Sequence, residues 1–278
     1  MSKKLAVVII HGMGSHKNEL ENNIHLYAKP MIDELEDRIK SQNKDPGQVA
    51  WKTIYWANVL ETPEIKYFNE MKNKSDVDWI TLRKFIITAF GDATGYRKER
   101  DSVNGTYQRV HEKIRDAIKE LFENDLGSTS VPLIILAHSL GGHMMSNYIY
   151  DRQKSAVDAP PVASDFERLH TLAGMVTFGC NIPLFTFAYN PIVPIEFPAR
   201  QLDDTIKQKS KWLNFYDPDD ILGYPLKPIP EYDAVVNKDI PINVGGILTS
   251  WNPVSHTEYW TDNSFTGPVA KFICDFLN

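Results

Sequence analysis

Short runs of apolar residues alternate along the chain with longer stretches whose apolar positions recur every three or four residues. A continuous apolar, β-branched run is typical of a strand buried on both faces, and the three-to-four spacing is typical of a helix that covers a sheet. The runs, together with one alternating segment at 49–57, predict strands at residues 5–10, 49–57, 131–136, 172–180, 211–216 and 235–244.

The helical spacing predicts helices around residues 19–40, 79–90 and 107–122, one directly after residue 139, and a last one near 269–277. Strands that alternate with helices favour a mostly parallel sheet with helices on both faces. We therefore predict the α/β fold class, with a single domain over residues 1–278.

Two segments depart from this alternation. Residues 58–106 form a longer connection than one crossover helix requires, and residues 181–210 include the proline- and phenylalanine-rich stretch 182–198. This stretch is too apolar for a simple exposed loop and too rich in proline for one long helix. We predict that both segments are insertions that form a helical and irregular cap or lid; a loop packed on the core is the alternative for 182–198.

Composition narrows the class of protein. The chain has 278 residues, 42% of them hydrophobic and 24% charged, with a formal net charge of −6. A negative chain is a poor candidate for nonspecific nucleic-acid binding, so we expect no nucleic-acid partner. No apolar segment reaches the roughly 20 residues that span a bilayer, and the run after Lys3 and Lys4 is too short for a secretion signal. The sequence predicts a cytoplasmic enzyme without a transmembrane segment.

Cysteine and histidine spacing adds no metal or redox chemistry. Two cysteines, Cys180 and Cys274, are too few for a disulfide framework. The chain has neither a CxxC nor an HExxH pattern. We therefore expect no metal and no cofactor.

The most informative motif is AHSLGG at residues 137–142, which directly follows the apolar run 131–136. A buried strand that ends in small-His-Ser-x-Gly-Gly is typical of a nucleophile elbow, a sharp strand-to-helix turn with an exposed serine in strained geometry. The two glycines let the following helix pack close to the strand. We predict that Ser139 is a covalent nucleophile.

A second motif, HGMG at residues 11–14, ends the first strand. Acyl-transfer chemistry needs donors for an oxyanion, and backbone N–H groups in a glycine-rich loop beside an elbow can supply them. We predict that the N–H groups of Met13 and Leu140 form the oxyanion hole. A strand-to-loop turn without chemistry is the alternative for 11–14.

These motifs resemble the α/β-hydrolase superfamily, and within it the lipase and serine-esterase branch. The resemblance is carried by residues 11–14, 137–142, 177–180, 216–222 and 255–260, which together span nearly the whole chain. It implies an α/β-hydrolase fold and a catalytic order of serine, then aspartate or glutamate, then histidine along the chain.

His256 fits the last position of that order. It is one of eight histidines, five of which precede Ser139, and it alone lies in the C-terminal region on a loop-like segment before the final helix. A triad base belongs on such a loop, where its ring can reach the elbow. We predict that His256 is the general base; a solvated loop histidine is the alternative.

Three aspartates follow the strand at 211–216 and compete for the acid position: Asp217, Asp219 and Asp220. In lipases of the resembled kind the acid is commonly an Asp followed by two small or apolar residues and then a proline-bearing loop, which favours Asp220. Asp217 is second because it directly follows the strand, and Asp219 is third. A solvated Asp-Pro turn accounts for those that do not serve as the acid.

The resemblance implies a serine hydrolase that cleaves a carboxylic ester, either a small molecule or a lipid, through an acyl-enzyme intermediate. Alternatives are an acyltransferase, an amidase or a lyase on the same fold, since fold does not fix function, and a noncatalytic binding module. A peripheral lipase that engages lipid through its cap is a further alternative. The sequence sets neither the natural substrate nor the oligomeric state.

Overall fold

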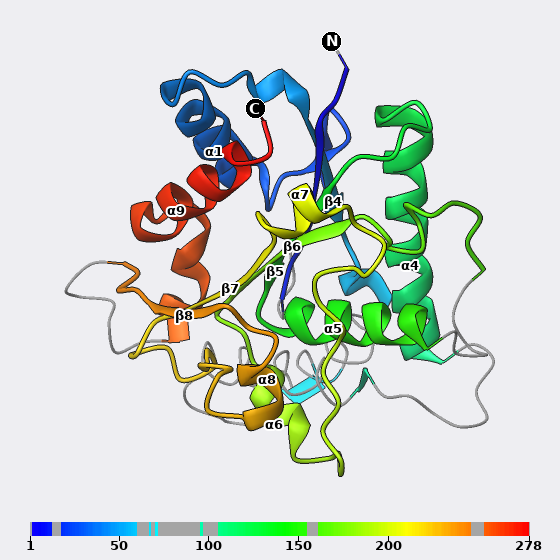
Figure 1. The fold of residues 1–278 in the computed structure, drawn as a ribbon. Coiled ribbons are helices and arrows are strands. Elements are labelled where there is room, and N and C mark those ends of the chain that lie inside the picture. Colours follow the sequence, from blue (N-terminus) through cyan, green and yellow to red (C-terminus); the bar gives the residue numbers. More distant parts are fainter. Residues whose placement is uncertain are drawn as a thin grey trace.

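The computed structural model describes residues 2–12, 18–59, 67, 70–71, 95–96, 105–154, 161–245 and 253–277. Within these ranges a six-stranded sheet, entirely parallel, runs through the centre of the molecule in the order β4-β1-β5-β6-β7-β8 (Figure 1). Its strands are β1 (Leu5–Ile10), β4 (Val49–Ile54), β5 (Leu133–His138), β6 (Leu172–Phe178), β7 (Lys211–Tyr216) and β8 (Lys238–Pro241). The predicted α/β class with a mostly parallel sheet is confirmed.

Helices flank this sheet on two sides. Helix α1 (Lys29–Ser41) packs beside α9 (Asn263–Cys274), while α4 (Thr106–Glu120) packs against α5 (Leu140–Gln153) on the other side (Figure 1). The shorter helices are α6 (Ile182–Thr186), α7 (Asp204–Lys207) and α8 (Pro230–Asp233), and 3-10 turns occupy Pro46–Gln48, Ala57–Val59 and Pro253–Thr261. A π-turn at Leu121–Asp125 extends α4. In the part of the chain that the structure describes, none of the helices combines the length and apolar character needed to cross a membrane.

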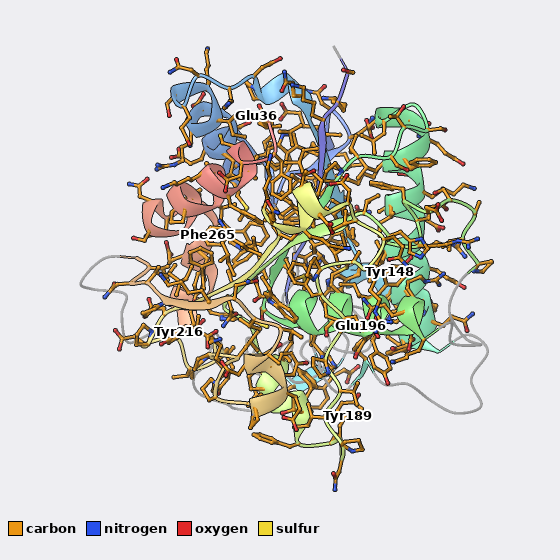
Figure 2. The ribbon with its side chains drawn as sticks, viewed as in Figure 1. Glu36, Tyr148, Tyr189, Glu196, Tyr216 and Phe265 are labelled. Carbon is orange, nitrogen blue, oxygen red and sulfur yellow. The ribbon has the colours of Figure 1, made fainter. Side chains whose placement is uncertain are left out.

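The core lies between the sheet and the two helical layers. Every residue of β1, β5 and β6 is buried, as the continuous apolar runs predict. Phe265 of α9 points at the sheet (Figure 2), where its ring centroid lies 4.5 Å from that of Phe178 and 5.1 Å from that of Phe215. Burying one such side chain stabilises the fold by roughly 1.5–3 kcal/mol, so α9 is fixed firmly against the strands that lead to the site.

Strand order places the two predicted motifs side by side. From β1 the chain crosses to β4 at one edge and then returns to β5 on the other side of β1. Ligands of such doubly wound sheets bind at the carboxyl ends of the strands, where the winding direction reverses. Here that point lies between β1 and β5, whose ends pair through Ile10 and Ala137. Residues 11–14 and 137–142 begin at that point.

The first predicted helix, at 19–40, is wrong in its first half. Residues Leu20–Glu21 and Ile24–His25 pair instead as the short antiparallel strands β2 and β3. Asn22 and Asn23 form the turn with φ of 51° and 64°, a left-handed conformation that asparagine tolerates better than most residues. Helix α1 begins at Lys29, with proline in its first turn, where the missing N–H is not needed.

Other boundaries also shift. The predicted strand at 235–244 shortens to β8, at the sheet edge, and the predicted helix at 269–277 begins earlier, at Asn263. The Asp262 side chain accepts a hydrogen bond from Ser264 N at 2.7 Å, which caps that helix. Pro268 lies within α9 and does not interrupt it, whereas the predicted helix begins only after this proline.

The structure describes one of the two predicted insertions in full and the other only in small part. Most of 58–106, with the predicted helix at 79–90, lies outside the described residues. Residues 181–210 contain α6 and α7, joined by irregular backbone. Several large apolar side chains here are exposed, among them Phe187 at 84% and Tyr189 at 55%. The segment is thus partly helical and partly irregular, as predicted, while its role as a cap stays a prediction.

Candidate active site

Ser139 occupies the junction between β5 and α5 with an unusual backbone. Its φ is 52° and its ψ is −127°, a combination that costs a non-glycine residue roughly 1–3 kcal/mol. The N–H of Ser139 donates to the carbonyl of Phe178, at the end of β6, over 3.0 Å. The surrounding structure therefore holds the serine in the sharp strand-to-helix turn that the sequence predicts. The predicted exposure of this serine is wrong, because the residue is fully buried.

Two glycines allow the end of β1 to touch this turn. A Cβ atom on Gly141 would lie 2.5 Å from the carbonyl oxygen of His11, and one on Gly12 would overlap Cβ of Ser139. Real Cβ atoms essentially never approach other heavy atoms this closely. Both positions exclude side chains because the backbone after β1 and the first turn of α5 are in direct contact.

Three side chains from distant parts of the chain form a continuous hydrogen-bonded series. Nδ1 of His256 lies 2.8 Å from Oδ2 and 3.0 Å from Oδ1 of Asp220, and Nε2 lies 2.7 Å from Oγ of Ser139. An ionised carboxylate only accepts, so Nδ1 carries the ring proton and Nε2 is free to accept from the serine hydroxyl. All three residues are buried. In this tautomer the unprotonated nitrogen of His256 faces the Ser139 hydroxyl.

The Asp220 carboxylate is stabilised in its charged form. Burial alone raises the pKa of this group, but the hydrogen bond and charge of His256, the N–H of Leu222 and the hydroxyl of Tyr259 outweigh burial and lower the pKa below its usual value. Leu222 N donates to Oδ1 at 3.0 Å and Tyr259 Oη donates to Oδ2 at 2.9 Å. The group is thus held as an acceptor for His256.

The other two candidate acids are engaged elsewhere. Oδ1 of Asp217 accepts from Asp219 N and Oδ2 accepts from Val244 N, both at 2.8 Å. Asp219 is exposed. Of the three aspartates, the structure brings Asp220 to the His256 ring, while Asp217 ties the turn after β7 to the segment after β8.

Two residues for which the sequence predicts no role in the site, His138 and Tyr259, contact this series. His138 Nε2 donates to the carbonyl of His256 at 2.8 Å, and the Tyr259 hydroxyl accepts from Asp217 N at 2.8 Å while it donates to Asp220. Tyr259 follows His256 by three residues within the 3-10 turn Pro253–Thr261, and side chains at i and i+3 of such a turn share a face. Predicting this 3-10 turn from the sequence would have placed Tyr259 on the same face as His256.

Of the two predicted oxyanion donors, Leu140 lies within the described residues. Leu140 is the first residue of α5 and fully buried. The first N–H groups of a helix have no intrahelical acceptor and lie at its positive end, so the Leu140 N–H is suited to an anion beside Ser139. Met13 lies outside the described residues.

The two cysteines do not form a disulfide with each other. Cys180 and Cys274 are both free thiols, and burial raises the pKa of Cys180 to about 12, which keeps it protonated at neutral pH. Among the described residues, no three or more histidine, cysteine, aspartate or glutamate side chains group together as a metal site would require.

Comparison with known proteins adds little. No protein-family model matches the sequence, and no curated protein sequence matches it either. Among solved structures, the chain is similar to an esterase domain of a Rhodothermus marinus protein, with 11% identity over 96% of this chain and 85% of that one, at a TM-score of 0.38. Similarity at this level assigns no activity to the chain.

Proposed function

We propose that this protein is a serine hydrolase of the α/β-hydrolase type that cleaves carboxylic esters through an acyl-enzyme intermediate. One observation carries the proposal. Ser139 lies in a strained strand-to-helix turn, and its hydroxyl lies 2.7 Å from a buried imidazole that a carboxylate orients. A structural role alone does not account for this combination. Strained residues of this kind cluster at active sites, where the surrounding structure holds them in place.

In the first half-reaction, His256 Nε2 removes the proton from Ser139 Oγ while Oγ attacks the ester carbonyl carbon. Asp220 keeps Nδ1 protonated and stabilises the imidazolium that forms. The Leu140 N–H and, as the sequence predicts, the Met13 N–H bind the oxyanion of the tetrahedral intermediate. Each such donor is worth roughly 3 kcal/mol of transition-state stabilisation.

Collapse of this intermediate breaks the bond to the leaving alcohol, which takes the proton from His256 Nε2. In the second half-reaction the same nitrogen removes a proton from water as the water oxygen attacks the acyl-enzyme. The second tetrahedral intermediate releases the carboxylic acid, and Nε2 returns the proton to Ser139 Oγ. The cycle uses the protein's own groups throughout, and the substrate class is a small-molecule or lipid ester.

The test is covalent labelling of the full-length protein with a fluorophosphonate, followed by peptide mapping, together with hydrolysis of p-nitrophenyl acetate and octanoate. We expect an adduct on Ser139 and ester turnover, both abolished by Ser139→Ala. Ser210→Ala is the matched control, since Ser210 is also buried but lies before β7, at the opposite end of the strands. An unlabelled Ser139 together with absent ester turnover would refute the proposal and leave a binding module as the better reading.

A further inference from the structure

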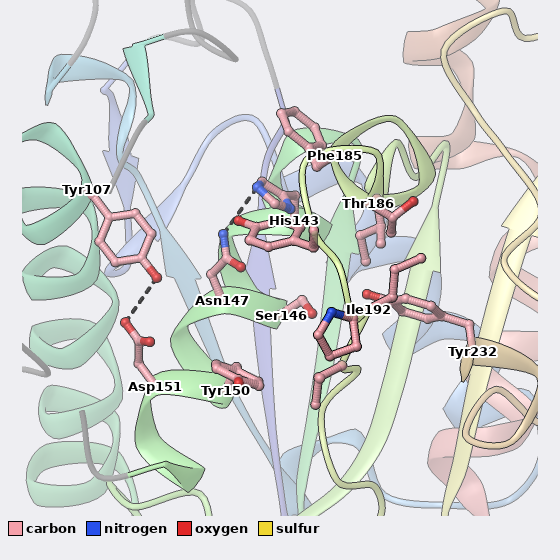
Figure 3. A pocket seen from close by; sticks show the side chains of 14 residues that line it. Tyr107, His143, Ser146, Asn147, Tyr150, Asp151, Phe185, Thr186, Ile192 and Tyr232 are labelled. Atoms are coloured by element: carbon pink, nitrogen blue, oxygen red, sulfur yellow. Dashed lines mark hydrogen bonds between the residues drawn. The ribbon is translucent and has the colours of Figure 1, made fainter. Parts of the chain in front are cut away.

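A separate cavity of about 190 Å³ lies along one side of α5 (Figure 3). Its walls come from α5, from Tyr107 at the start of α4, from the segment around α6, and from Tyr232 of α8. It begins at His143, one helical turn beyond Ser139, and extends along α5 to Asp151. The described residues that line it include none of the three residues in the hydrogen-bonded series at Ser139.

Aromatic rings form much of this lining. The ring of His143 stacks on that of Phe185 at a centroid distance of 3.9 Å and an angle of 10°. Burial lowers the pKa of His143 to about 3, so its ring is neutral at physiological pH. Four tyrosines and three aliphatic residues complete the apolar part of the lining, namely Tyr107, Tyr150, Tyr189, Tyr232, Ile182, Ile192 and Val193. A ligand in the cavity therefore meets mainly neutral rings and aliphatic groups.

The polar side chains of the lining are hydrogen-bonded within the protein. The Asn147 amide donates to Nε2 of His143 at 3.1 Å, and the Tyr107 hydroxyl donates to Oδ2 of Asp151 at 2.9 Å (Figure 3). Oγ1 of Thr186 donates to a backbone carbonyl of its own helix, α6, at 2.7 Å. None of the described lining residues has a buried side-chain nitrogen or oxygen without a hydrogen-bond partner. The cavity therefore does not require a ligand that brings a charge.

The lining is unsuited to an anion. Asp151 is the one carboxylate among the described lining residues, and its side chain is 6% exposed. Nδ1 of His111 lies 3.7 Å from the same oxygen that accepts from Tyr107, so Asp151 belongs to the contact between α5 and α4. Arginine and lysine are absent from the described lining. An anionic ligand would lose its water beside this carboxylate without a cation of the lining to pair with, which is costly.

We propose that this cavity binds a small molecule through an uncharged aromatic ring. Its volume suits a single ring, because an apolar cavity of roughly 150 Å³ holds benzene. Aromatic rings in contact attract each other in offset-stacked and edge-to-face arrangements, beyond the gain from buried area. The lining therefore favours a flat ring over a saturated ring of the same size. The site is independent of the proposed hydrolysis, since Ser139 is not part of its described lining.

The test titrates three ring compounds of similar size, benzyl alcohol, benzoate and cyclohexylmethanol, into the full-length protein and follows binding by NMR. We expect benzyl alcohol to bind at least tenfold more tightly than the anion benzoate and severalfold more tightly than the saturated cyclohexylmethanol. An affinity for benzyl alcohol no higher than that for either comparison compound, or no binding at millimolar concentration, would overturn the proposal. This comparison needs no variant, so it decides the question even if substitutions in the cavity impair folding.

Substitutions then locate the bound ring. Phe185→Leu removes the ring that stacks on His143, so it should weaken benzyl alcohol binding severalfold and change cyclohexylmethanol binding little. Phe187→Leu is the matched control, because Phe187 is 84% exposed and is not among the described lining residues. Ser139→Ala should bind benzyl alcohol normally, which separates this proposal from the proposed hydrolysis. Unchanged benzyl alcohol affinity in a folded Phe185→Leu protein would place the ring outside this cavity and contradict the proposal.

Discussion

His256 is held at three points, and each contact fixes a different property. Asp220 sets the tautomer through Nδ1, Ser139 occupies Nε2, and His138 binds the backbone carbonyl. The ring therefore has little freedom to turn away from the serine. The carboxylate that orients it is itself fixed by Tyr259 and by the N–H of Leu222. The contacts that position Ser139, His256 and Asp220 thus include groups outside this series.

Replacing the carboxylate tests the acid assignment directly. Asp220→Asn should lower kcat for ester hydrolysis by about 10⁴-fold, because an amide no longer enforces the tautomer or stabilises the imidazolium. Steady-state kinetics with p-nitrophenyl acetate measure this. Asp219→Asn, on the same turn but exposed, should retain the activity of the unmodified protein. An active Asp220→Asn enzyme would move the acid role to another residue.

Tyr259→Phe tests positioning without touching the reacting groups. The variant loses the hydroxyl that donates to Asp220 and accepts from Asp217 N. A hydrogen bond to a charged group is worth about 1.5–3 kcal/mol, so kcat should fall roughly tenfold or more while KM stays unchanged. Because that hydroxyl also helps to lower the pKa of Asp220, activity in the variant should begin to fall at a higher pH on the acid side. An unchanged acid limb would mean a purely structural role.

At this scale the sequence predicts some roles better than others. Ser139 stands out because its motif follows a buried strand, and His256 because of its place near the end of the chain. The sequence could only rank Asp217, Asp219 and Asp220, since all three lie in one turn. Their directions depend on distant partners, Val244 N for Asp217 and the His256 ring for Asp220.

Among elements, the contact between the end of β1 and the first turn of α5 is the tightest constraint near the site. Trp56 Nε1 donates to the carbonyl of His11 at 2.9 Å, so this carbonyl cannot simply move aside for a new atom on α5. The carbonyl lies where a side chain on Gly141 would go. The geometry of the strand-to-helix turn at Ser139 therefore depends on Trp56, which follows β4, as well as on residues 137–142.

Gly141→Ala should accordingly destabilise the protein by about 1–3 kcal/mol, the usual cost of forcing an atom into a packed region, and strongly reduce ester hydrolysis. Gly267→Ala is the matched control. Apart from its chain neighbours, a Cβ there meets nothing nearer than the Arg38 guanidinium at 3.5 Å. Gly267 lies inside α9, where alanine is the better helix former, but Pro268 follows it and disfavours helical backbone for a preceding residue with a Cβ. Because these effects oppose each other, Gly267→Ala should change the free energy of unfolding by less than about 1 kcal/mol. Urea unfolding of both variants gives the comparison, and equal effects would contradict it.

At this scale, the sequence predicts the boundaries of helices and strands less well than their presence. The apolar positions Ile24, Met31, Leu35 and Ile39 suit one long helix, yet residues 20–25 form a hairpin. Its turn depends on Asn22 and Asn23, whose left-handed backbone is not visible in hydrophobic spacing. The buried strands were predictable because a parallel sheet covered on both faces requires continuous apolar runs.

For the molecule as a whole, the parallel sheet is what unites residues 11, 139, 220 and 256. The carboxyl ends of β1, β5 and β7 lie at one edge of the sheet, and the segments that follow them meet there. The order of the motifs along the chain predicts this convergence. It does not predict the cavity of about 190 Å³ along α5 (Figure 3), because the lining residues come from α4, α5, α8 and the segment around α6.

Acid stability should depend on this convergence. Because the folded protein lowers the pKa of Asp220, the ionised carboxylate contributes stability that is fully present above its unfolded pKa of about 3.9 and is lost as pH falls through the folded value. Asp220→Asn should therefore reduce the free energy of unfolding more at pH 7 than at pH 3. Urea unfolding at both pH values measures the difference, and a loss independent of pH would argue against this linkage.

The complete burial of Ser139 has a kinetic consequence. A reagent can react with a hydroxyl that has no surface in contact with solvent only during transient excursions that uncover it. The rate of covalent inactivation should then rise with reagent concentration at low doses and level off at the frequency of those excursions. A strictly proportional rate at all doses would mean that the serine is reached without any rearrangement.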